Sequence, residues 1–437
     1  MISTQRRKLL AAGGLGALGL WALKPGAKGA PHSPYFSELA RAIKLAGIAT
    51  PTLVIDRQQL RNNAGKVMAH IAQRMDFRLV VKSLPSHALI QDITSITKSR
   101  RMMLFSLPQL GLMAKGDADI LLGKPMPVAA AAKFYQSAGG AQQDSQQDFY
   151  PEQQLQWLMD SPERLLQYRE LARQQALTMR LNFELDVGLH RGGISSSKML
   201  QEMLTILQSE PRLQFSGMMG YDAHVAKIPD LPGLRAQAHL HAHELYTRLA
   251  NEALASVATF KAGTAPSEKQ KLVFNAAGSP TYRLYDGSGI QNELSVGSAM
   301  LKPSDFDLPG LADLSPAVFI ATPVLKVPEK FMMPYGVEAI GNVARSLDVN
   351  QQNAAFIYGG NWLADPVSPS GLSVSALYGN SSNQQVLVGS GNQQLKVDDI
   401  VFFRPRQSEA VLQQFGDIAV YENGKIVDMW TVFPATA

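Results

Sequence analysis

The sequence predicts an α/β protein in which a (β/α)₈ barrel is followed by a C-terminal domain of β-strands. From Pro51 onward, short apolar runs with strand character alternate with longer stretches whose apolar residues recur at helical spacing. This alternation indicates parallel strands that are connected by helices. Eight or nine such units over roughly 250 residues favour a closed barrel over an open sheet. After Lys302, prolines separate short β-rich runs, which indicates a second, all-β domain.

Nine segments before the second domain are candidate strands. They are residues 52–56, 77–81, 101–106, 118–123, 154–160, 179–188, 215–224, 271–278 and 292–301. Helices are predicted between them. Ser161 can cap one of these helices, with Pro162 in its first turn. Residues 197–210 carry apolar side chains at helical spacing and predict another.

Composition divides the chain into three segments. We expect a signal sequence or membrane anchor over residues 1–33, the barrel over 34–305 and the β domain over 306–437. In the β domain, the Asn-Gly pair between Glu422 and Lys425 is a strong hairpin signal.

The first segment has the features of a secretory signal. It begins with basic residues, continues with an apolar, Gly-rich stretch from Leu9 to Leu23 that is short for a spanning helix, and ends in small residues. Arg6 and Arg7 resemble a twin-arginine signal, although Lys8 stands before the leucines. This pattern predicts a periplasmic or inner-membrane-anchored protein, with a cytoplasmic location as the alternative.

The charge and the cysteine count exclude several classes of function. Five basic residues and no acid lie within residues 1–30, and they account for the whole formal charge of +5. The rest of the chain is neutral and offers no electrostatic basis for binding nucleic acid, and contact with a membrane is expected only through the leader. The absence of cysteine excludes disulfides, a thiolate nucleophile and cysteine-ligated metal.

Unusual polar residues follow the predicted barrel strands, where the reactive groups of such barrels gather. Lys82 ends the apolar run FRLVV; alone, it could simply mark the point where a strand reaches the surface. Two later strand ends carry further candidates, which are Asp186, His190 and Arg191 on one and Tyr221, Asp222 and His224 on the next. Asp186 and Arg191 could also form a structural ion pair.

A turn of small residues, NAAGSPTY, follows the strand predicted at 271–278. Its backbone N–H groups and the hydroxyls of Ser279 and Thr281 can bind a phosphate, a frequent use of the last barrel loops. Together with Lys82, Arg191 and His224, this turn suits pyridoxal phosphate. That cofactor needs a lysine amine, donors for its phosphate and groups that tune its ring.

The chain resembles the fold-type III pyridoxal-phosphate enzymes, which include the alanine racemases and the D-serine dehydratase/D-threonine aldolase group. RLVVKSLPSH is similar to the strand with the Schiff-base lysine, which implies this role for Lys82. FELDVGLHRGGI and GMMGYDAHVA resemble the segments whose arginine lies near the phenolic oxygen and whose histidine packs on the pyridine ring, which implies Arg191 and His224. NAAGS resembles the phosphate turn, whose implied residues are Gly278, Ser279, Thr281 and Tyr282.

Other segments complete the resemblance or depart from it. TPTLVIDRQQLRNNAGKV resembles the first barrel strand and helix of the family. Ser295, in LSVG, stands where racemases have an arginine against the pyridine nitrogen, which weakens the implication of a strict racemase mechanism. Gln407, Glu409 and Tyr378 stand where the dehydratase/aldolase group has its metal ligands, and this set is a poor zinc site. We therefore expect no metal.

The resemblance implies a pyridoxal-phosphate enzyme that acts on free amino acids, chiefly D-amino acids, as a racemase or as a lyase. Lys82 would act as a base, with Tyr221 or Tyr335 as the second acid/base. The alternatives are a non-catalytic pyridoxal-phosphate homeostasis protein and an exported binding protein that kept the barrel. Two-domain relatives imply a homodimer.

The leader generates a prediction about location. Replacing Arg6 and Arg7 by two lysines should keep the protein in the cytoplasm, because twin-arginine export depends on the arginine pair. Cell fractionation and immunoblotting measure this. Unchanged periplasmic or membrane recovery of the double variant would contradict the twin-arginine interpretation.

Overall fold

The computed structural model describes residues 25–434, except for 72–73, 141–148, 230, 261–270, 337 and 339–347. The predicted signal features at Arg6, Arg7 and 9–23 lie outside the described residues. The described chain forms two compact units. The barrel unit is Gln58–Ala317 with the residues from Thr431 on, and the sheet unit is the segment up to Arg57 with Val318–Trp430. Of the described helices, none has the length and hydropathy that crossing a membrane requires.

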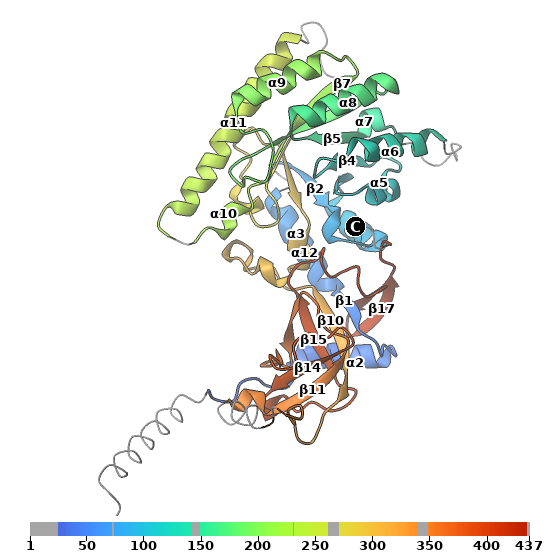
Figure 1. Ribbon diagram of the computed structural model, residues 1–437, viewed down its shortest axis with the longest axis vertical. Helices are drawn as coiled ribbons and strands as arrows, with labels where there is room; N and C mark the ends of the chain where they lie inside the picture. Colours follow the sequence, from blue (N-terminus) through green and yellow to red (C-terminus); the bar gives the residue numbers. More distant parts are fainter. Residues whose placement is uncertain are drawn as a thin grey trace, which may run out of the picture. The chain divides into compact units, whose positions relative to one another are not determined.

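Eight parallel strands form the closed barrel (Figure 1). Each strand pairs with the next in chain order, and the last pairs with the first. The strands are β2 (Asp76–Val80), β3 (Arg101–Leu104), β4 (Asp119–Leu122), β5 (Leu155–Met159), β6 (Met179–Leu185), β7 (Leu213–Gly220), β8 (Val273–Ala276) and β9 (Glu293–Val296). The predicted (β/α)₈ barrel with a separate β domain is confirmed.

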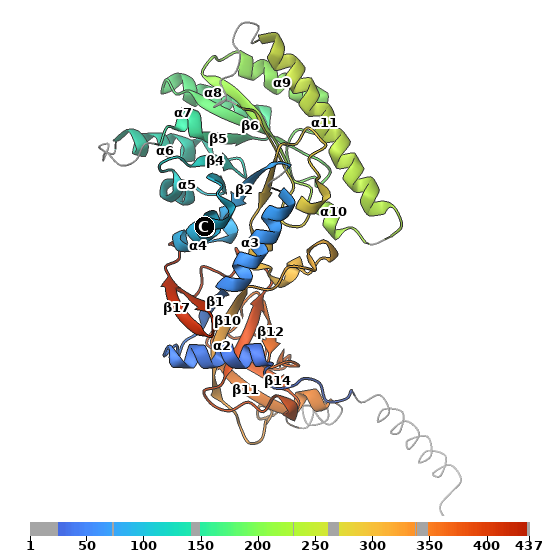
Figure 2. The ribbon, with the colours of Figure 1, turned by 180° about the vertical axis from the view of Figure 1, so that it is seen from behind.

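Helices surround the barrel strands (Figure 2). They are α3 (Arg57–Ile71), α4 (His87–Thr97), α5 (Leu107–Met113), α6 (Val128–Gly140), α7 (Pro151–Gln154), α8 (Pro162–Gln174), α9 (Ser197–Gln208), α10 (His224–Lys227), α11 (Leu234–Phe260) and α12 (Ser298–Leu301). The predicted cap is present, because the Ser161 hydroxyl accepts a hydrogen bond from the N–H of Arg164 at the start of α8.

The sheet unit holds one nine-stranded sheet. Its strands are β1 (Thr52–Asp56), β10 (Val318–Lys326), β11 (Asn353–Tyr358), β12 (Ala364–Ser368), β13 (Ser373–Val374), β14 (Gln384–Gly389), β15 (Ile400–Pro405), β16 (Ile418–Glu422) and β17 (Lys425–Trp430). The helix α2 (Pro34–Leu45) buries Leu39 and Ile43 against this sheet. Strands β16 and β17 form the predicted hairpin, with Asn423 and Gly424 at positive φ.

The first predicted strand was assigned to the wrong sheet. β1 pairs antiparallel with β10 and parallel with β16, and it is not part of the barrel. All five of its residues are buried, and a short apolar strand of this kind has the same pattern at the centre of either sheet. Lys82 therefore follows the first strand of the barrel, β2.

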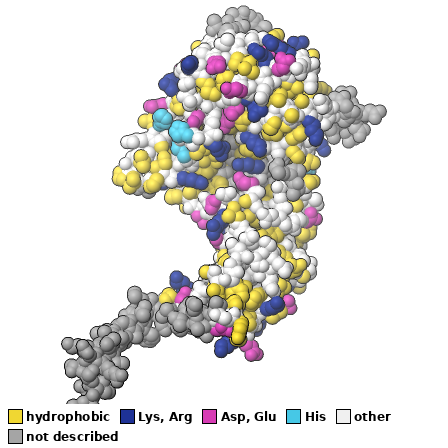
Figure 3. Space-filling model, viewed as in Figure 1, with side chains coloured by type: hydrophobic (Ala, Val, Ile, Leu, Met, Phe, Trp, Pro, Cys, Tyr) yellow, Lys and Arg dark blue, Asp and Glu magenta, His cyan; other side chains and the backbone are white. Residues whose placement is uncertain are grey.

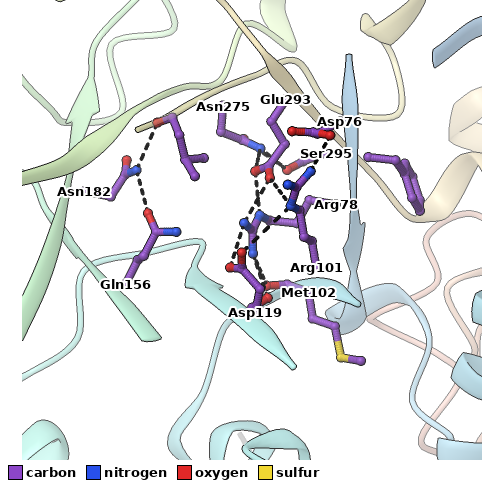
Figure 4. A network of polar contacts seen from close by, with 12 residues as sticks. Asp76, Arg78, Arg101, Met102, Asp119, Gln156, Asn182, Asn275, Glu293 and Ser295 are labelled. Atoms are coloured by element: carbon purple, nitrogen blue, oxygen red, sulfur yellow. Dashed lines mark hydrogen bonds and ion pairs between the residues drawn. The ribbon is translucent and has the colours of Figure 1, made fainter. Parts of the chain in front are cut away.

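A buried network of charged and polar side chains occupies the barrel interior (Figure 4). The Arg78 guanidinium, which is fully buried, donates to both Glu293 carboxylate oxygens at 2.6 and 3.0 Å and to Asp119 Oδ1 at 3.0 Å. The Asn275 amide donates to Glu293 Oε1 and to Ser295 Oγ, both at 2.8 Å. Because these residues come from β2, β4, β8 and β9, the network connects barrel strands that are far apart in the sequence.

This network generates a stability prediction. Arg78→Met should lower the free energy of unfolding by about 3 kcal/mol, because it removes the buried guanidinium that donates to both oxygens of the buried Glu293 carboxylate and leaves Glu293 only the longer ion pair with the partly exposed Arg101. Urea unfolding followed by circular dichroism measures the change. Arg100→Met is the matched control, since Arg100 and its partner Asp117 are both about two-thirds exposed. Equal, small losses in the two variants would contradict the prediction.

Candidate active site

Lys82 lies at the C-terminal end of β2, in a single turn of 3₁₀ helix, η1 (Val81–Ser83). The half-buried side chain places Nζ 4.7 Å from the centroid of the Phe105 ring, which follows β3. Gly123 makes room for this ring, since a β-carbon there would lie 2.3 Å from the Phe105 Cζ atom. The lysine amine is therefore held over an aromatic face at the barrel rim.

Arg191 and Tyr221 lie against each other on the same rim. The Arg191 Cζ atom is 5.1 Å from the centroid of the Tyr221 ring. The backbone of Gly278 also lies against this ring, because a β-carbon at that position would lie 2.4 Å from Tyr221 Cε2. Three of the predicted site residues, from the loops after β6, β7 and β8, are thus in contact.

The considered ion pair between Asp186 and Arg191 is absent from the described contacts. Asp186 instead accepts hydrogen bonds from the N–H of Gly188 at 3.1 Å and from the N–H of His190 at 2.9 Å. Its other oxygen lies 3.0 Å from His190 Nδ1. The Asp186 carboxylate therefore stabilises its own loop through these hydrogen bonds, and Arg191 packs on the Tyr221 ring instead.

His224 begins the short helix α10 and lies against Gly188, whose missing side chain leaves room for the imidazole ring. Its Nδ1 atom is buried and has no hydrogen-bond partner among the described residues. Burial lowers the pKa of His224, so the neutral imidazole is favoured near pH 7. Further histidines come from α11, and Figure 3 shows histidine side chains gathered on the face formed by α10 and α11.

The small-residue turn after β8 has the donors that a phosphate needs. The Ser279 hydroxyl accepts hydrogen bonds from the N–H groups of Gly297 and Ala299, at 3.1 and 3.0 Å. Its own proton has no acceptor among the described residues. The N–H groups of Gly278, Ser279 and Ser298 likewise donate to no described residue.

Two side chains of the turn are oriented differently from the expectation. The Thr281 hydroxyl donates to Asp222 Oδ1 at 2.5 Å, so in this arrangement its proton is not available to a phosphate. Tyr282 is fully buried, its ring lies 5.5 Å from that of His70, and its hydroxyl accepts from Arg283. The turn therefore offers backbone N–H groups and the Ser279 hydroxyl.

Two acidic residues of the rim were missed in the sequence. Glu184, in β6, follows Arg180 and Asn182 at a spacing of two, and polar residues at this period in a buried strand could have indicated an inward-facing row. Burial and the Asp160 carboxylate raise the pKa of Glu184 to about 7, even with Arg191 nearby. Asp160, which follows β5, has a buried Oδ1 without a partner in the described chain. The Glu184 carboxyl group is therefore a candidate for holding a proton at the rim.

The described residues contain no group of three or more His, Asp or Glu side chains arranged to hold a metal ion. The expectation that no metal is bound stays a prediction. Tyr335, the other candidate acid/base, belongs to the sheet unit, where its side chain is fully exposed.

The raised pKa of Glu184 generates a pH prediction. A carboxyl whose pKa is higher in the folded than in the unfolded state stabilises the fold when protonated, and stability falls as the pH rises from about 4.5 to about 7. Glu184→Gln should therefore gain about 2 kcal/mol over the native protein between about pH 5 and about pH 8.

Urea unfolding at several pH values measures this difference. Glu202→Gln, on the exposed face of α9, is the matched control and should follow the native pH profile. Parallel pH profiles for Glu184→Gln and the native protein would contradict the assignment.

Three solved structures resemble this chain over most of its length. D-threonine aldolase from Filomicrobium marinum has 16% identity and a TM-score of 0.67, covering 89% of this chain and 95% of that one. D-threo-3-hydroxyaspartate dehydratase from Delftia sp. HT23 has 13% identity and a TM-score of 0.67, covering 89% and 98%. Alanine racemase from Bacillus anthracis has 15% identity and a TM-score of 0.61, covering 88% and 98%. At these identities the likeness shows the fold.

The sequence itself matches a known family. No curated protein matches it. The family described as "Alanine racemase, N-terminal domain" matches residues 55–305, which is more than half of the chain and includes Lys82, Arg191 and His224. The chain therefore belongs to the alanine racemase N-terminal domain family, within the fold-type III pyridoxal-phosphate proteins.

Proposed function

We propose that this protein is a pyridoxal-phosphate-dependent enzyme that acts on free amino acids and binds its cofactor covalently through Lys82. The observation that carries the proposal is a chain of contacts between the lysine and the turn with unpaired donors. Ser83, next to Lys82, shares a 2.7 Å hydrogen bond with Ser298, next to Gly297. The Gly297 N–H in turn donates to Ser279 Oγ at 3.1 Å. The residue that follows Lys82 is thus linked by two hydrogen bonds to the turn that carries the phosphate donors.

The residues on the rim fit the cofactor. The unpaired N–H groups of Gly278, Ser279 and Ser298 and the Ser279 hydroxyl are suited to a phosphate. Arg191 supplies a fixed positive charge. The neutral His224 ring, with Nδ1 unpaired, supplies a flat surface with one polar atom.

Each rim residue has a role in the proposed chemistry. When bound, pyridoxal phosphate supplies a ring that withdraws electrons from the α-carbon of an amino acid. Lys82 Nζ is proposed to take the α-proton from one side. Tyr221, held between Arg191 and Gly278, is the proposed acid/base for the other side. Glu184, with its pKa near neutrality, can store a proton next to Arg191.

We extend the proposal to D-amino acids as substrates. D-threonine aldolase and D-threo-3-hydroxyaspartate dehydratase are among the similar structures, and their names refer to D-configured compounds. At the position where racemases carry an arginine, Ser295 has a buried, neutral hydroxyl that is hydrogen-bonded to Asn275. Racemisation and lyase chemistry both use this set of residues, so product analysis distinguishes them. A homodimer is part of the proposal.

The proposal predicts a spectroscopic change. The native protein with pyridoxal phosphate should show the visible absorption band of a lysine-bound cofactor, and Lys82→Ala should lose it, because it removes the amine proposed to bind the cofactor. Lys133→Ala, on the exposed face of α6, is the matched control and should retain the band. Retention of the band in Lys82→Ala would contradict the covalent role.

Activity is then measured on a panel of D- and L-amino acids, with and without a chelator. Loss of optical activity identifies a racemase, and release of a keto acid or an aldehyde identifies a lyase. If no amino acid of the panel reacts or exchanges its α-proton in deuterated water, the proposed enzyme activity is wrong, and a cofactor-homeostasis role takes its place.

A further inference from the structure

Asp222 is a buried carboxyl group directly behind the turn after β8. Its side chain is fully buried, and its two oxygens accept hydrogen bonds from two hydroxyl groups. Thr281 Oγ1 donates to Oδ1 at 2.5 Å, and the Tyr285 hydroxyl donates to Oδ2 at 2.9 Å. Because Thr281 and Tyr285 flank the 3₁₀ turn η3 (Tyr282–Leu284), the carboxyl group holds this turn at both ends.

The environment of Asp222 shows that these two hydroxyls are its main support. Among the described residues it forms no ion pair with lysine or arginine. The basic groups that interact with its charge are His224 and His239, and the His239 ring lies edge-on to Tyr285 at 5.5 Å. Burial raises the pKa of Asp222, and the hydrogen bonds from Thr281 and Tyr285 oppose this rise. A buried carboxyl group without a cation is costly, so its hydroxyl donors are strongly constrained in position.

The small-residue turn that precedes η3, which includes Gly278 and Ser279, is also held in place. The Ser279 hydroxyl accepts from the N–H groups of Gly297 and Ala299, and Gly278 lies against the Tyr221 ring. The residues with unpaired N–H groups, Gly278 and Ser279, thus lie between two anchors. One anchor is the β9 end and the other is Asp222, which is next to Tyr221 in the chain.

We propose that Asp222 is a positioning residue that fixes the phosphate-binding turn through Thr281, so that it determines the affinity for the phosphate of the cofactor without touching it. The inference rests on the proposed function. It explains why the Thr281 hydroxyl donates to Asp222: its contribution is to orient the turn. It also couples the loop after β7, which carries Tyr221 and His224, to the loop after β8.

Two probes separate this role from a general structural one. Pyridoxal phosphate and pyridoxal both form the lysine adduct, but only the first has a phosphate. Asp222→Asn keeps the size of the side chain and replaces one acceptor oxygen by an N–H₂ group that cannot accept from a hydroxyl. We expect the dissociation constant for pyridoxal phosphate, measured by absorbance titration, to rise on the order of tenfold. The constant for pyridoxal should stay within twofold of the native value.

A second pair of variants tests the route through Thr281. Thr281→Val should weaken the binding of pyridoxal phosphate to a similar degree. Thr281→Ser, which keeps the hydroxyl, should bind pyridoxal phosphate as tightly as the native protein does. The double variant Asp222→Asn/Thr281→Val should be no weaker than either single variant, because both break one contact. Asp286→Asn is the matched control, since this exposed carboxylate follows η3 and, in the part of the chain that the structure describes, accepts hydrogen bonds from Ser288 and not from Thr281 or Tyr285.

Three outcomes would overturn the inference. The first is an equal loss for pyridoxal and pyridoxal phosphate, which indicates a general structural role. The second is unchanged binding of pyridoxal phosphate by Asp222→Asn, which would mean that the carboxyl group does not position the turn, or tighter binding, which would mean that it only repels the phosphate. The third is additive losses in the double variant. Failure of the native protein and of Asp286→Asn to bind pyridoxal phosphate is distinct from these, and it would overturn the proposed function together with the inference.

Discussion

The fold depends on the pairing of buried charge inside the barrel. Arg78 is fully buried, and its charge is stabilised there because the carboxylates of Glu293 and Asp119 accept its N–H groups. Arg78 comes from the first barrel strand and Glu293 from the last, so this contact lies where the cylinder closes. Asn275 and Ser295 extend the network along β8 and β9, the strands whose ends carry the candidate phosphate turn and its neighbour. The polar network inside the barrel therefore fixes the two strands whose ends form this part of the rim.

Close backbone approaches organise the rim above this network. Glycine at 278 lets the Tyr221 ring contact the turn, and glycine at 297 lets β9 approach Val80, since a β-carbon there would lie 2.5 Å from the Val80 carbonyl oxygen. Hydroxyl groups then connect the loops, as between Ser83 and Ser298. The backbone N–H groups of Gly278, Ser279 and Ser298, which lie beside these contacts, have no partners in the described chain. Unpaired N–H donors of this kind can bind an anion.

Much of the site could be predicted from the sequence because parallel strands bring their C-terminal ends together. Lys82, Arg191 and His224 each follow such an end, and the structure brings all three to one rim. Glu184 was missed because it lies within a run that looks like an ordinary buried strand. The direction of the Thr281 hydroxyl could not be predicted, since its partner is 59 residues away in the chain.

The sequence by itself determined the class of the fold, the order of its strands and helices, and the residues at the strand ends. These properties follow from local periodicity, from caps and turns, and from the handful of residue types that carry chemistry. Only the tertiary structure decided that β1 joins the second sheet, that Asp186 bonds within its own loop, and that Asp222 holds the turn after β8. The physical reason is that each of these features depends on the partner that a strand or a polar group contacts in the folded chain. The local sequence pattern does not identify that partner.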